Sequence, residues 1–251
     1  MSNKLLIKKL PQMILFDYGH TLIYEKGFDA ISGYEAVLAY ATRNENHHTA
    51  SEIAAMSDKL FMEIGYNSRN YGIEIHDHMF ERFMSEYLEI EYSLSPREFE
   101  KIFWEAAAPG IPMSNVREML AFIDQKGIRS GVISNIAFSG DALSERINRL
   151  LPENRFEFII ASSEYIFRKP NKLLFELALK KAHLKPEEVW FCGDHPKYDI
   201  SGASGAGIYP VWYQSELDCY YWQMDKELKP DCDFLHIHDW KELISVLQNM
   251  E

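Results

Sequence analysis

Four short motifs in this 251-residue chain carry side chains that could act on an anionic substrate. They read FDYGHTL (16–22), VISN (132–135), RKP (168–170) and CGDHPKYD (192–199). The first motif places Asp17 directly after an apolar run, where its carboxylate could attack phosphorus and form an aspartyl phosphate. Such a two-step route suits phosphate monoester hydrolysis, which is among the slowest uncatalysed reactions. The alternative role for Asp17 is that of a turn or helix-capping residue.

An anionic nucleophile and an anionic phosphate repel each other, so the site would need fixed positive charge. Lys169 could supply one charge, unless it is a solvated surface lysine. Asp194 and Asp199 follow another apolar run in a GDxxxxD pattern and would crowd Asp17 with like charge. A divalent ion that prefers oxygen ligands would remove this conflict, so the carboxylates predict Mg²⁺ as a cofactor. The alternative role for Asp194 is helix capping.

The apolar runs that precede these motifs alternate with segments of helical periodicity, a pattern typical of a parallel α/β sheet. Strands are predicted at 13–16, 128–133, 158–161, 189–192 and 234–237, and helices at 115–126, 172–183 and 239–250. In an open parallel sheet, ligands bind outside the carboxyl ends of the strands, so the polar residues after the runs should share one crevice. The sequence therefore predicts an α/β fold with a doubly wound parallel sheet.

The stretch between the first two of these strands, residues 27–106, shows strong helical periodicity and little strand signal. It predicts a separate helical module. The chain is thereby divided into an α/β core of residues 1–25 and 107–251 and a helical domain of residues 26–106. Two apolar stripes are interpreted as the core of this module: Met79, Phe80, Phe83, Met84, Tyr87 and Leu88, and then Phe99, Phe103 and Trp104.

The four motifs, in this order and each at a strand end or helix start, resemble the haloacid dehalogenase (HAD) superfamily. The resemblance covers residues 10–24 and about 107–251, and the helical module stands where that superfamily carries its type 1 cap. It implies a Rossmann-like core in which Asp17 is the nucleophile and Lys169 bridges it to the phosphate. It also implies that Ser134 and neighbouring backbone N–H groups hold a phosphate oxygen, so that Ser134, Asn135 and Lys169 bind the substrate.

The same resemblance implies a metal site. Asp17 and Asp194 would bind Mg²⁺ directly, the backbone carbonyl of Gly19 would be a further ligand, and Asp199 would support them.

One position departs from the pattern of the superfamily's phosphatases. These enzymes usually carry a second aspartate two residues after the nucleophile, where it protonates the leaving group, and here that residue is Gly19. General acid–base catalysis contributes ~10² to 10⁴ in rate, so its loss would lower the rate of the reaction. His20 is the local candidate to replace the acid. A cap residue, the substrate itself, or an acyl or aryl leaving group that barely needs a proton are the alternatives. Gly19 is also expected to let the chain turn sharply.

Three other functions compete with a phosphatase. In a dehalogenase, Asp17 would attack carbon and expel halide; such enzymes of the superfamily dispense with Mg²⁺, so the presence of Asp194 and Asp199 argues against it. A phosphonate-cleaving enzyme would need a reactive cap lysine, for which Lys26 and Lys59 are the candidates. A degraded site could serve as a metabolite-binding module, but a pure scaffold would not require the whole set of polar residues. The sequence therefore favours a Mg²⁺-dependent phosphatase of a small phosphorylated metabolite.

The composition limits the partners of the chain. A net charge of −12 argues against nucleic acid or an anionic membrane as a partner. No stretch approaches the roughly 20 apolar residues that span a bilayer, and the N-terminus does not resemble a secretory signal. Three cysteines with no CxxC pair fit free thiols. We expect a cytoplasmic monomer or homodimer that acts on a small phosphorylated or otherwise anionic substrate.

Other residues are weaker candidates. The pairs His76 and His78, and His236 and His238, are interpreted as solvated rather than metal-binding. The aromatic stretch 213–231, with Tyr220, Tyr221 and Trp222, is expected to pack on its own core, although it could line the pocket mouth or a subunit contact. Residues that could meet the distal part of a substrate are Tyr24, Arg69, Tyr71 and Arg82.

Overall fold

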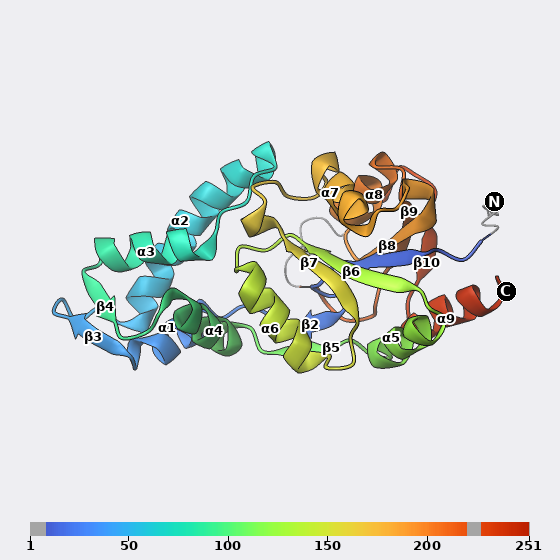
Figure 1. The fold of residues 1–251 in the computed structure, drawn as a ribbon. Helices are drawn as coiled ribbons and strands as arrows, with labels where there is room; N and C mark the ends of the chain where they lie inside the picture. Colours follow the sequence, from blue (N-terminus) through green and yellow to red (C-terminus); the bar gives the residue numbers. More distant parts are fainter. Residues whose placement is uncertain (1–8, 220–226, 251) are drawn as a thin grey trace.

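The central element of the fold is a parallel sheet (Figure 1). The structure is a computed structural model that describes residues 9–219 and 227–250, without the side chains of residues 66–69. Within these residues, six strands follow the order β10-β9-β8-β1-β6-β7, and all paired neighbours are parallel. Their bounds are β1 (Met13–Phe16), β6 (Arg129–Ser134), β7 (Phe156–Ala161), β8 (Val189–Gly193), β9 (Tyr209–Tyr213) and β10 (Leu235–Ile237). The predicted α/β fold with a doubly wound sheet is confirmed, because this is the strand order of the two-halved Rossmann arrangement.

Helices cover both faces of this sheet (Figure 1). They are α5 (Val116–Gln125), α6 (Gly140–Leu150), α7 (Lys172–Ala182), α8 (Gly202–Gly205) and α9 (Trp240–Gln248). Alternate side chains of β1 point to opposite faces: Met13 and Leu15 pack with α7, while Ile14 and Phe16 pack with α5, α6 and α9. With both faces buried, β1 is apolar throughout, as expected for a central parallel strand.

A helical insertion lies to one side of the sheet, at the left of Figure 1. This inserted segment, residues 26–106, contains α1 (Ala30–Leu38), α2 (Ala50–Tyr71), α3 (Asp77–Tyr87) and α4 (Pro96–Ala107). Helix α4 begins where its residue types predict, because Pro96 occupies the first turn and Ser95 forms a capping box with Glu98. Its buried apolar residues belong to the same hydrophobic cluster as the α5, α6 and α9 face of the sheet.

Short strands in and beside the inserted segment were not predicted. β3 (Ala41–Asn44) pairs antiparallel with β4 (Ile90–Tyr92) inside it. β2 (Ile23–Glu25) pairs antiparallel with β5 (Gly110–Pro112), so the chain enters and leaves the segment side by side. Strands of three or four residues carry too few positions to show a period of two.

The first apolar stripe was predicted as bundle core, and half of that prediction is wrong. Phe80 and Met84 are buried, but Met79, Phe83 and Tyr87 are 61%, 51% and 66% exposed. The two rows lie on different faces of α3, and only the row of Phe80 and Met84 faces the interior. The second stripe, Phe99, Phe103 and Trp104, is buried as predicted.

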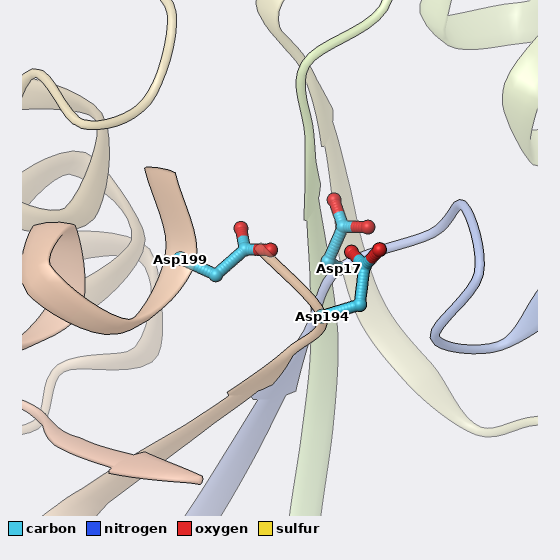
Figure 2. A group of neighbouring side chains, drawn as sticks. All are labelled: Asp17, Asp194 and Asp199. Carbon is cyan, nitrogen blue, oxygen red and sulfur yellow. The ribbon is translucent and has the colours of Figure 1, made fainter. Parts of the chain in front are cut away.

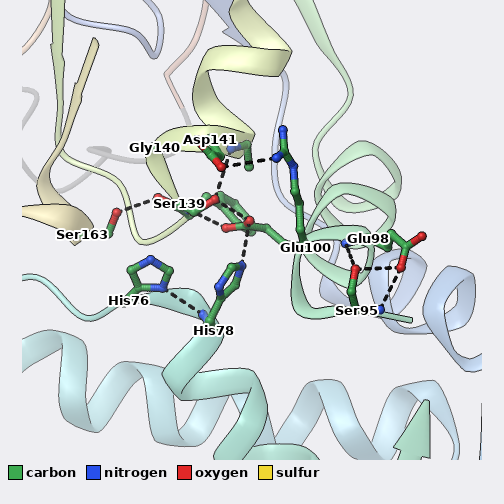
Figure 3. Close-up of polar contacts among 12 residues, drawn as sticks. His76, His78, Ser95, Glu98, Glu100, Ser139, Gly140, Asp141 and Ser163 are labelled. Atoms are coloured by element: carbon green, nitrogen blue, oxygen red, sulfur yellow. Dashed lines mark hydrogen bonds and ion pairs between the residues drawn. The ribbon is translucent and has the colours of Figure 1, made fainter. Parts of the chain in front are cut away.

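The inserted segment is joined to the sheet by buried polar contacts (Figure 3). Glu100 of α4 is fully buried and accepts hydrogen bonds from the backbone N–H and the hydroxyl of Ser139, the N-cap residue of α6. His78 lies 3.0 Å from the same carboxylate, and the backbone N–H of Asp77 donates to the carbonyl of Ala137 at 2.9 Å. His76 caps α3 and lies 3.5 Å from Glu164, so the prediction that this histidine pair is simply solvated is wrong.

No helix in the described part of the chain has both the length and the apolar character needed to cross a bilayer. The aromatic residues Tyr220, Tyr221 and Trp222 lie outside the described residues, as does the side chain of Arg69. His236 of β10 is exposed and contacts Gln214 at 3.0 Å, as expected for a solvated strand residue.

Candidate active site

Three carboxylates meet at the carboxyl ends of the central strands (Figure 2). Asp17 follows β1, Asp194 follows β8, and Asp199 lies in a helical turn of residues Pro196–Ser201. One carboxylate oxygen from each lies within 4.8 Å of the other two, and all three side chains are buried. Strands β1 and β8 are the neighbours at which the doubly wound order reverses, which is where ligands bind in folds of this kind.

Backbone contacts fix the positions of these carboxylates. The N–H of Asp17 donates to the carbonyl of Cys192 at 2.9 Å, which ties the end of β1 to β8. Asp199 packs directly over Gly193, where any Cβ would lie 2.5 Å from the aspartate side chain. The backbone N–H of His195 donates to Asp199 Oδ2 at 2.9 Å. Glycine at 193 therefore lets Asp199 reach the site, which explains its place in the GDxxxxD pattern.

Lys169 is the cation of the site. Its side chain is 1% exposed, and its Nζ donates to Asp17 Oδ1 at 2.6 Å, to Asp199 Oδ1 at 2.6 Å and to the carbonyl of Ile133 at 2.9 Å. Burial lowers the pKa of Lys169, but Asp17 and Asp199 together raise it above its ordinary value. The ammonium is therefore charged at neutral pH and offsets the charge of two carboxylates.

Asn135 holds Lys169 in place rather than facing outward. Its Nδ2 donates to the Lys169 carbonyl at 3.0 Å, and its Oδ1 accepts from the Lys169 N–H at 2.7 Å. The donor and the acceptor of the side-chain amide are thus both hydrogen-bonded to the backbone of Lys169. These contacts support a positioning role for the Asn135 side chain, and the substrate contact predicted for this residue stays a prediction. Ser134 ends β6 beside β1 with its side chain buried.

The nucleophile candidate has a perturbed pKa. Burial raises the pKa of Asp17 from its usual range to about 6; Asp199 adds to this rise, while Lys169 and the backbone N–H of Tyr18 oppose it. Further positive charge beside Asp17 would lower the pKa again. Without such charge, Asp17 is only partly ionised near pH 6.

His20 is poorly suited to be the missing acid. Burial lowers its pKa to about 4, so the ring is neutral at pH 7 and carries no readily lost proton. Its ring lies against Tyr24, at 5.4 Å between ring centroids. The sharp turn predicted at Gly19 falls instead at His20, whose φ of 54° is in the left-handed region.

The candidates for distal substrate contacts differ in their exposure. Tyr71 is 76% exposed and Arg82 is exposed, while Tyr24 is half-buried against His20. Lys26 and Lys59, named for a phosphonate-cleaving reaction, are both exposed.

One contact to the site residues was missed. Glu74, in the inserted segment, accepts a hydrogen bond from Ser162 at 2.7 Å and pairs with Arg168, the residue before Lys169. Its backbone N–H also donates to the carbonyl of Ile166 at 2.6 Å. A single acidic residue before a helix gives no sequence signal of this contact, because its partners are about ninety positions away.

The carboxylate group fits Mg²⁺ in its chemistry. Asp17, Asp194 and Asp199 offer only oxygen atoms, which hard divalent cations prefer, and they are close enough to share one ion. Three buried carboxylates beside a single lysine also leave an excess of negative charge that an ion would offset.

Comparison with known proteins decides the family. The model of the family described as haloacid dehalogenase-like hydrolase matches residues 69–212, which is more than half of the chain. The chain belongs to the haloacid dehalogenase-like hydrolase family. The matched HAD segment contains Ser134, Lys169, Asp194 and Asp199, so the position of Asp17 beside them comes from the geometry of β1.

Curated relatives of this HAD family member include several phosphatases. The chain is 36% identical over 108 residues to a glyceraldehyde 3-phosphate phosphatase of Methanothermobacter thermautotrophicus, covering 42% of this chain and 46% of that protein. It is 31% identical over 134 residues to the protein of the same name from Pyrococcus furiosus, covering 53% and 52%. It is 33% identical over 90 residues to a phosphoserine phosphatase of Thermus thermophilus, covering 36% and 33%. The matches thus span about half or less of these relatives.

Solved structures support the HAD fold over nearly the whole chain. A 2-haloacid dehalogenase from Pseudomonas syringae matches with a TM-score of 0.61 and 22% identity, covering 96% of this chain and 100% of that one. A HAD phosphatase from Thermococcus onnurineus matches with a TM-score of 0.57 and 15% identity, covering 94% and 97%. At these identities the likeness concerns the fold alone.

Proposed function

We propose that this protein is a Mg²⁺-dependent phosphatase that cleaves a small phosphorylated metabolite through an aspartyl phosphate on Asp17. The observation that supports it best is the buried contact of Lys169 with both Asp17 and Asp199, beside Asp194. A fixed ammonium among three carboxylates suits a site that must take up a multiply charged anion. Retention of Asp194 and Asp199 favours this reaction over carbon–halogen cleavage.

The first step is attack by an Asp17 carboxylate oxygen on phosphorus. The bond from phosphorus to the leaving oxygen breaks, and its electron pair leaves with that oxygen. Lys169 holds the attacking carboxylate through its 2.6 Å hydrogen bond and offsets the charge of the incoming phosphate. Ser134, at the end of β6, offers a hydroxyl to a phosphate oxygen.

In the second step, the oxygen of a water bonds to phosphorus as the bond from phosphorus to the Asp17 oxygen breaks. Inorganic phosphate is released, the Asp17 carboxylate is restored, and the proton of the water passes to the released phosphate or to solvent. Asp17, Asp194 and the carbonyl of Gly19 would hold Mg²⁺, with Asp199 supporting them. When bound, the ion supplies positive charge against the carboxylates and the phosphate. Asn135 keeps Lys169 in position in both steps through its two bonds to the Lys169 backbone.

The substrate class follows from the relatives and from Gly19. Relatives named as phosphatases of glyceraldehyde 3-phosphate and phosphoserine support a small phosphorylated metabolite. Because no aspartate stands at 19, we propose that the natural leaving group departs with little protonation or carries its own acid. The net charge of −12 makes nucleic acid and anionic membranes poor partners, and we propose action in the cytoplasm as a monomer or homodimer.

We also propose that residues 1–25 and 107–251 form the catalytic core and residues 26–106 a helical cap. The antiparallel pairing of β2 with β5, where the chain enters and leaves the inserted segment, supports this division. Closure of the cap over the carboxylates would exclude water and strengthen the electrostatic interactions inside.

The test is phosphate release from acetyl phosphate, p-nitrophenyl phosphate and a panel of phosphorylated metabolites, with and without Mg²⁺. We expect Mg²⁺-dependent turnover that Asp17→Asn abolishes, with the fold of the variant intact by circular dichroism. A 2-haloacid substrate serves as a parallel assay. Halide release without phosphate release would assign the dehalogenase reaction instead, and binding of metabolites without any turnover would assign a binding module.

A further inference from the structure

We propose that Arg146 of α6 is a positioning residue that ties both chain connections of the inserted segment to the loop carrying Asp17. This inference deepens the proposed function and rests on it. Arg146 is 2% exposed and lies in a helix that carries none of the residues of the four motifs. A buried guanidinium is costly unless its donors are satisfied, so its partners indicate what it holds.

The first partner is the residue that follows the nucleophile. Arg146 Nε donates to the hydroxyl of Tyr18 at 2.8 Å, and that hydroxyl donates to Glu25 Oε1 at 3.0 Å. Tyr18 is 2% exposed, and its backbone N–H is one of the groups that lower the pKa of Asp17. One residue therefore contacts Arg146 through its side chain and the Asp17 carboxylate through its backbone.

Arg146 also contacts the two chain connections, residues 25–29 and 107–110, and its Nη1 lies 3.1 Å from Glu105 of α4. Arg146 Nη2 donates to Glu25 Oε1 at 3.0 Å where the chain enters the inserted segment, and to the carbonyl of Ala108 where it leaves. The connections are also bonded to each other, since the N–H of Asp29 donates to the carbonyl of Ala107 at 2.7 Å. A single guanidinium thus holds the entry, the exit and the nucleophile loop.

The space around Arg146 leaves it little freedom. Its guanidinium lies 4.4 Å from the ring centroid of Trp104, which stacks on Phe138 at 4.2 Å. A Cβ at Gly110 would lie 2.8 Å from Arg146 Nη2, so only glycine lets the exit connection pass this close. The ring and the backbone fix the plane of the guanidinium, which sets the direction of each bond it donates.

The consequence for the reaction is geometric. A small displacement of Tyr18 moves the backbone on which Asp17 sits, and misplacement of a reacting group by about 1 Å can cost on the order of 10² in rate. The same guanidinium holds both connections. A movement of the inserted segment about residues 25–29 and 107–110 would therefore shift the position of Asp17. Loss of this tie should therefore lower kcat more than it weakens substrate binding.

The test compares three variants with the wild-type chain. Tyr18→Phe removes only the hydroxyl between Arg146 and Glu25, and Arg146→Lys keeps the charge but loses the planar fork. Arg149→Lys is the matched control, because Arg149 lies one turn away on α6 and is exposed. The partner that it shares with Arg146 is Glu105, and a lysine can keep that ion pair. We expect kcat for p-nitrophenyl phosphate to fall about tenfold or more in the first two variants, with KM changed less than about threefold, and no change in the control.

Hydrogen exchange gives a readout that does not need activity. In Tyr18→Phe and Arg146→Lys, amide protection should fall together in peptides covering 18–29 and 104–113, while peptides of α7 and β8 keep theirs. If kcat and the hydrogen exchange of both connections stay at wild-type values in Tyr18→Phe, Arg146 does not couple the two connections to the loop of Asp17, and the proposal is overturned. If all peptides lose protection equally, Arg146 only stabilises the fold, and the proposal is again overturned.

The same design separates this inference from the proposed function. If the wild-type chain releases no phosphate from any ester with Mg²⁺, the phosphatase proposal fails, and the exchange data still show whether Arg146 joins the two connections. If the wild type is active but the control Arg149→Lys loses as much activity and protection as the two variants, the positioning role fails while the phosphatase proposal stands.

Discussion

At the scale of single residues, the site has two unusual features: the pKa of Asp17 is raised, and no aspartate stands at position 19. Asp17 has a pKa of about 6 because it is buried, and the charge of Lys169 only partly opposes this. Gly19 stands where a phosphatase of the superfamily would carry its general acid, and His20 is neutral at pH 7 with a pKa of about 4. The residues predict a site able to attack phosphorus but poorly equipped to protonate a leaving group.

Gly19→Asp should supply the missing acid. A Cβ at this position meets nothing within 4 Å, and the φ of Gly19 lies outside the left-handed region, so the side chain can be accommodated. We expect kcat for alkyl phosphates to rise about tenfold or more, with little change for p-nitrophenyl phosphate, whose leaving group needs no proton. The measurement is the dependence of rate on leaving-group pKa. Gly19→Asn is the matched control, and an equal gain in that variant would contradict the explanation.

Mg²⁺ affinity should depend on pH through Asp17. The ion needs the ionised carboxylate, so protons compete with it below a pKa of about 6. As pH falls from about 7.5 to about 5, the Kd for Mg²⁺ should rise up to about tenfold per pH unit below that pKa. Isothermal titration of the wild type checks this, with Asp17→Asn as the variant in which the dependence should weaken. A Kd that is flat over this range would rule out Asp17 as a ligand.

At the scale of elements, α4 is joined to α6 through a buried carboxylate. Glu100 accepts from the backbone N–H and hydroxyl of Ser139 and contacts His78 at 3.0 Å, as Figure 3 shows. It thereby satisfies an amide at the start of a helix that would otherwise be buried without a partner. The inserted segment therefore depends on the core for part of its stability.

Glu100→Ala should destabilise the protein strongly. The change leaves the donors of Ser139 and His78 without this acceptor, and a loss of about 2 to 4 kcal/mol in the free energy of unfolding is expected. Glu98→Gln on the same helix is the control, because Glu98 is exposed and serves only the local cap, so that its cost should be much smaller than that of Glu100→Ala. Urea denaturation measures both. Equal small losses would show that the Glu100 contacts contribute little.

At the scale of the whole molecule, stability should decline as pH rises toward neutrality through buried acids of the inserted segment. Burial raises the pKa of Glu81 to about 7, although the hydroxyl of Tyr34 donates to it at 2.9 Å. Burial and the neighbouring Glu81 and Glu100 also raise the pKa of Asp77 well above its usual range. A carboxyl with a raised folded-state pKa binds protons more tightly when folded, so it stabilises the fold below its unfolded pKa and loses this effect as pH rises through the folded value.

Glu81→Gln should therefore flatten the pH dependence of unfolding between about pH 4.5 and about pH 7. Over this window, the wild type should lose on the order of 3 kcal/mol through Glu81, which the neutral amide cannot lose. Thermal or urea unfolding at several pH values measures the slope. Exposed Glu86→Gln in the same helix is the control and should keep the wild-type slope. A slope unchanged in Glu81→Gln would contradict the assignment.

The sequence by itself predicted most of the sheet and most of the site, but in the described part of the chain it missed the sheet strand β9. Each apolar run ends at a polar residue, and parallel strands bring their carboxyl ends to one edge, so Asp17 and Asp194 could be placed together from residue types and order. Lys169 follows no strand directly, and its place beside Asp17 was expected from the need for a fixed cation and from the resemblance to the HAD superfamily. Family membership and the α/β fold followed from the same motifs.

Tertiary structure alone decided what supports these residues. Arg146 contacts Tyr18 across 128 positions and Glu25 across 121, and the Asn135 side chain bonds the Lys169 backbone across 34. Which row of α3 is buried was likewise set by the helices packed against it. Periodicity fixes which residues share a face, but it carries no information about which distant side chain meets that face. That pairing depends on how whole elements pack, and only the folded arrangement of those elements specifies it.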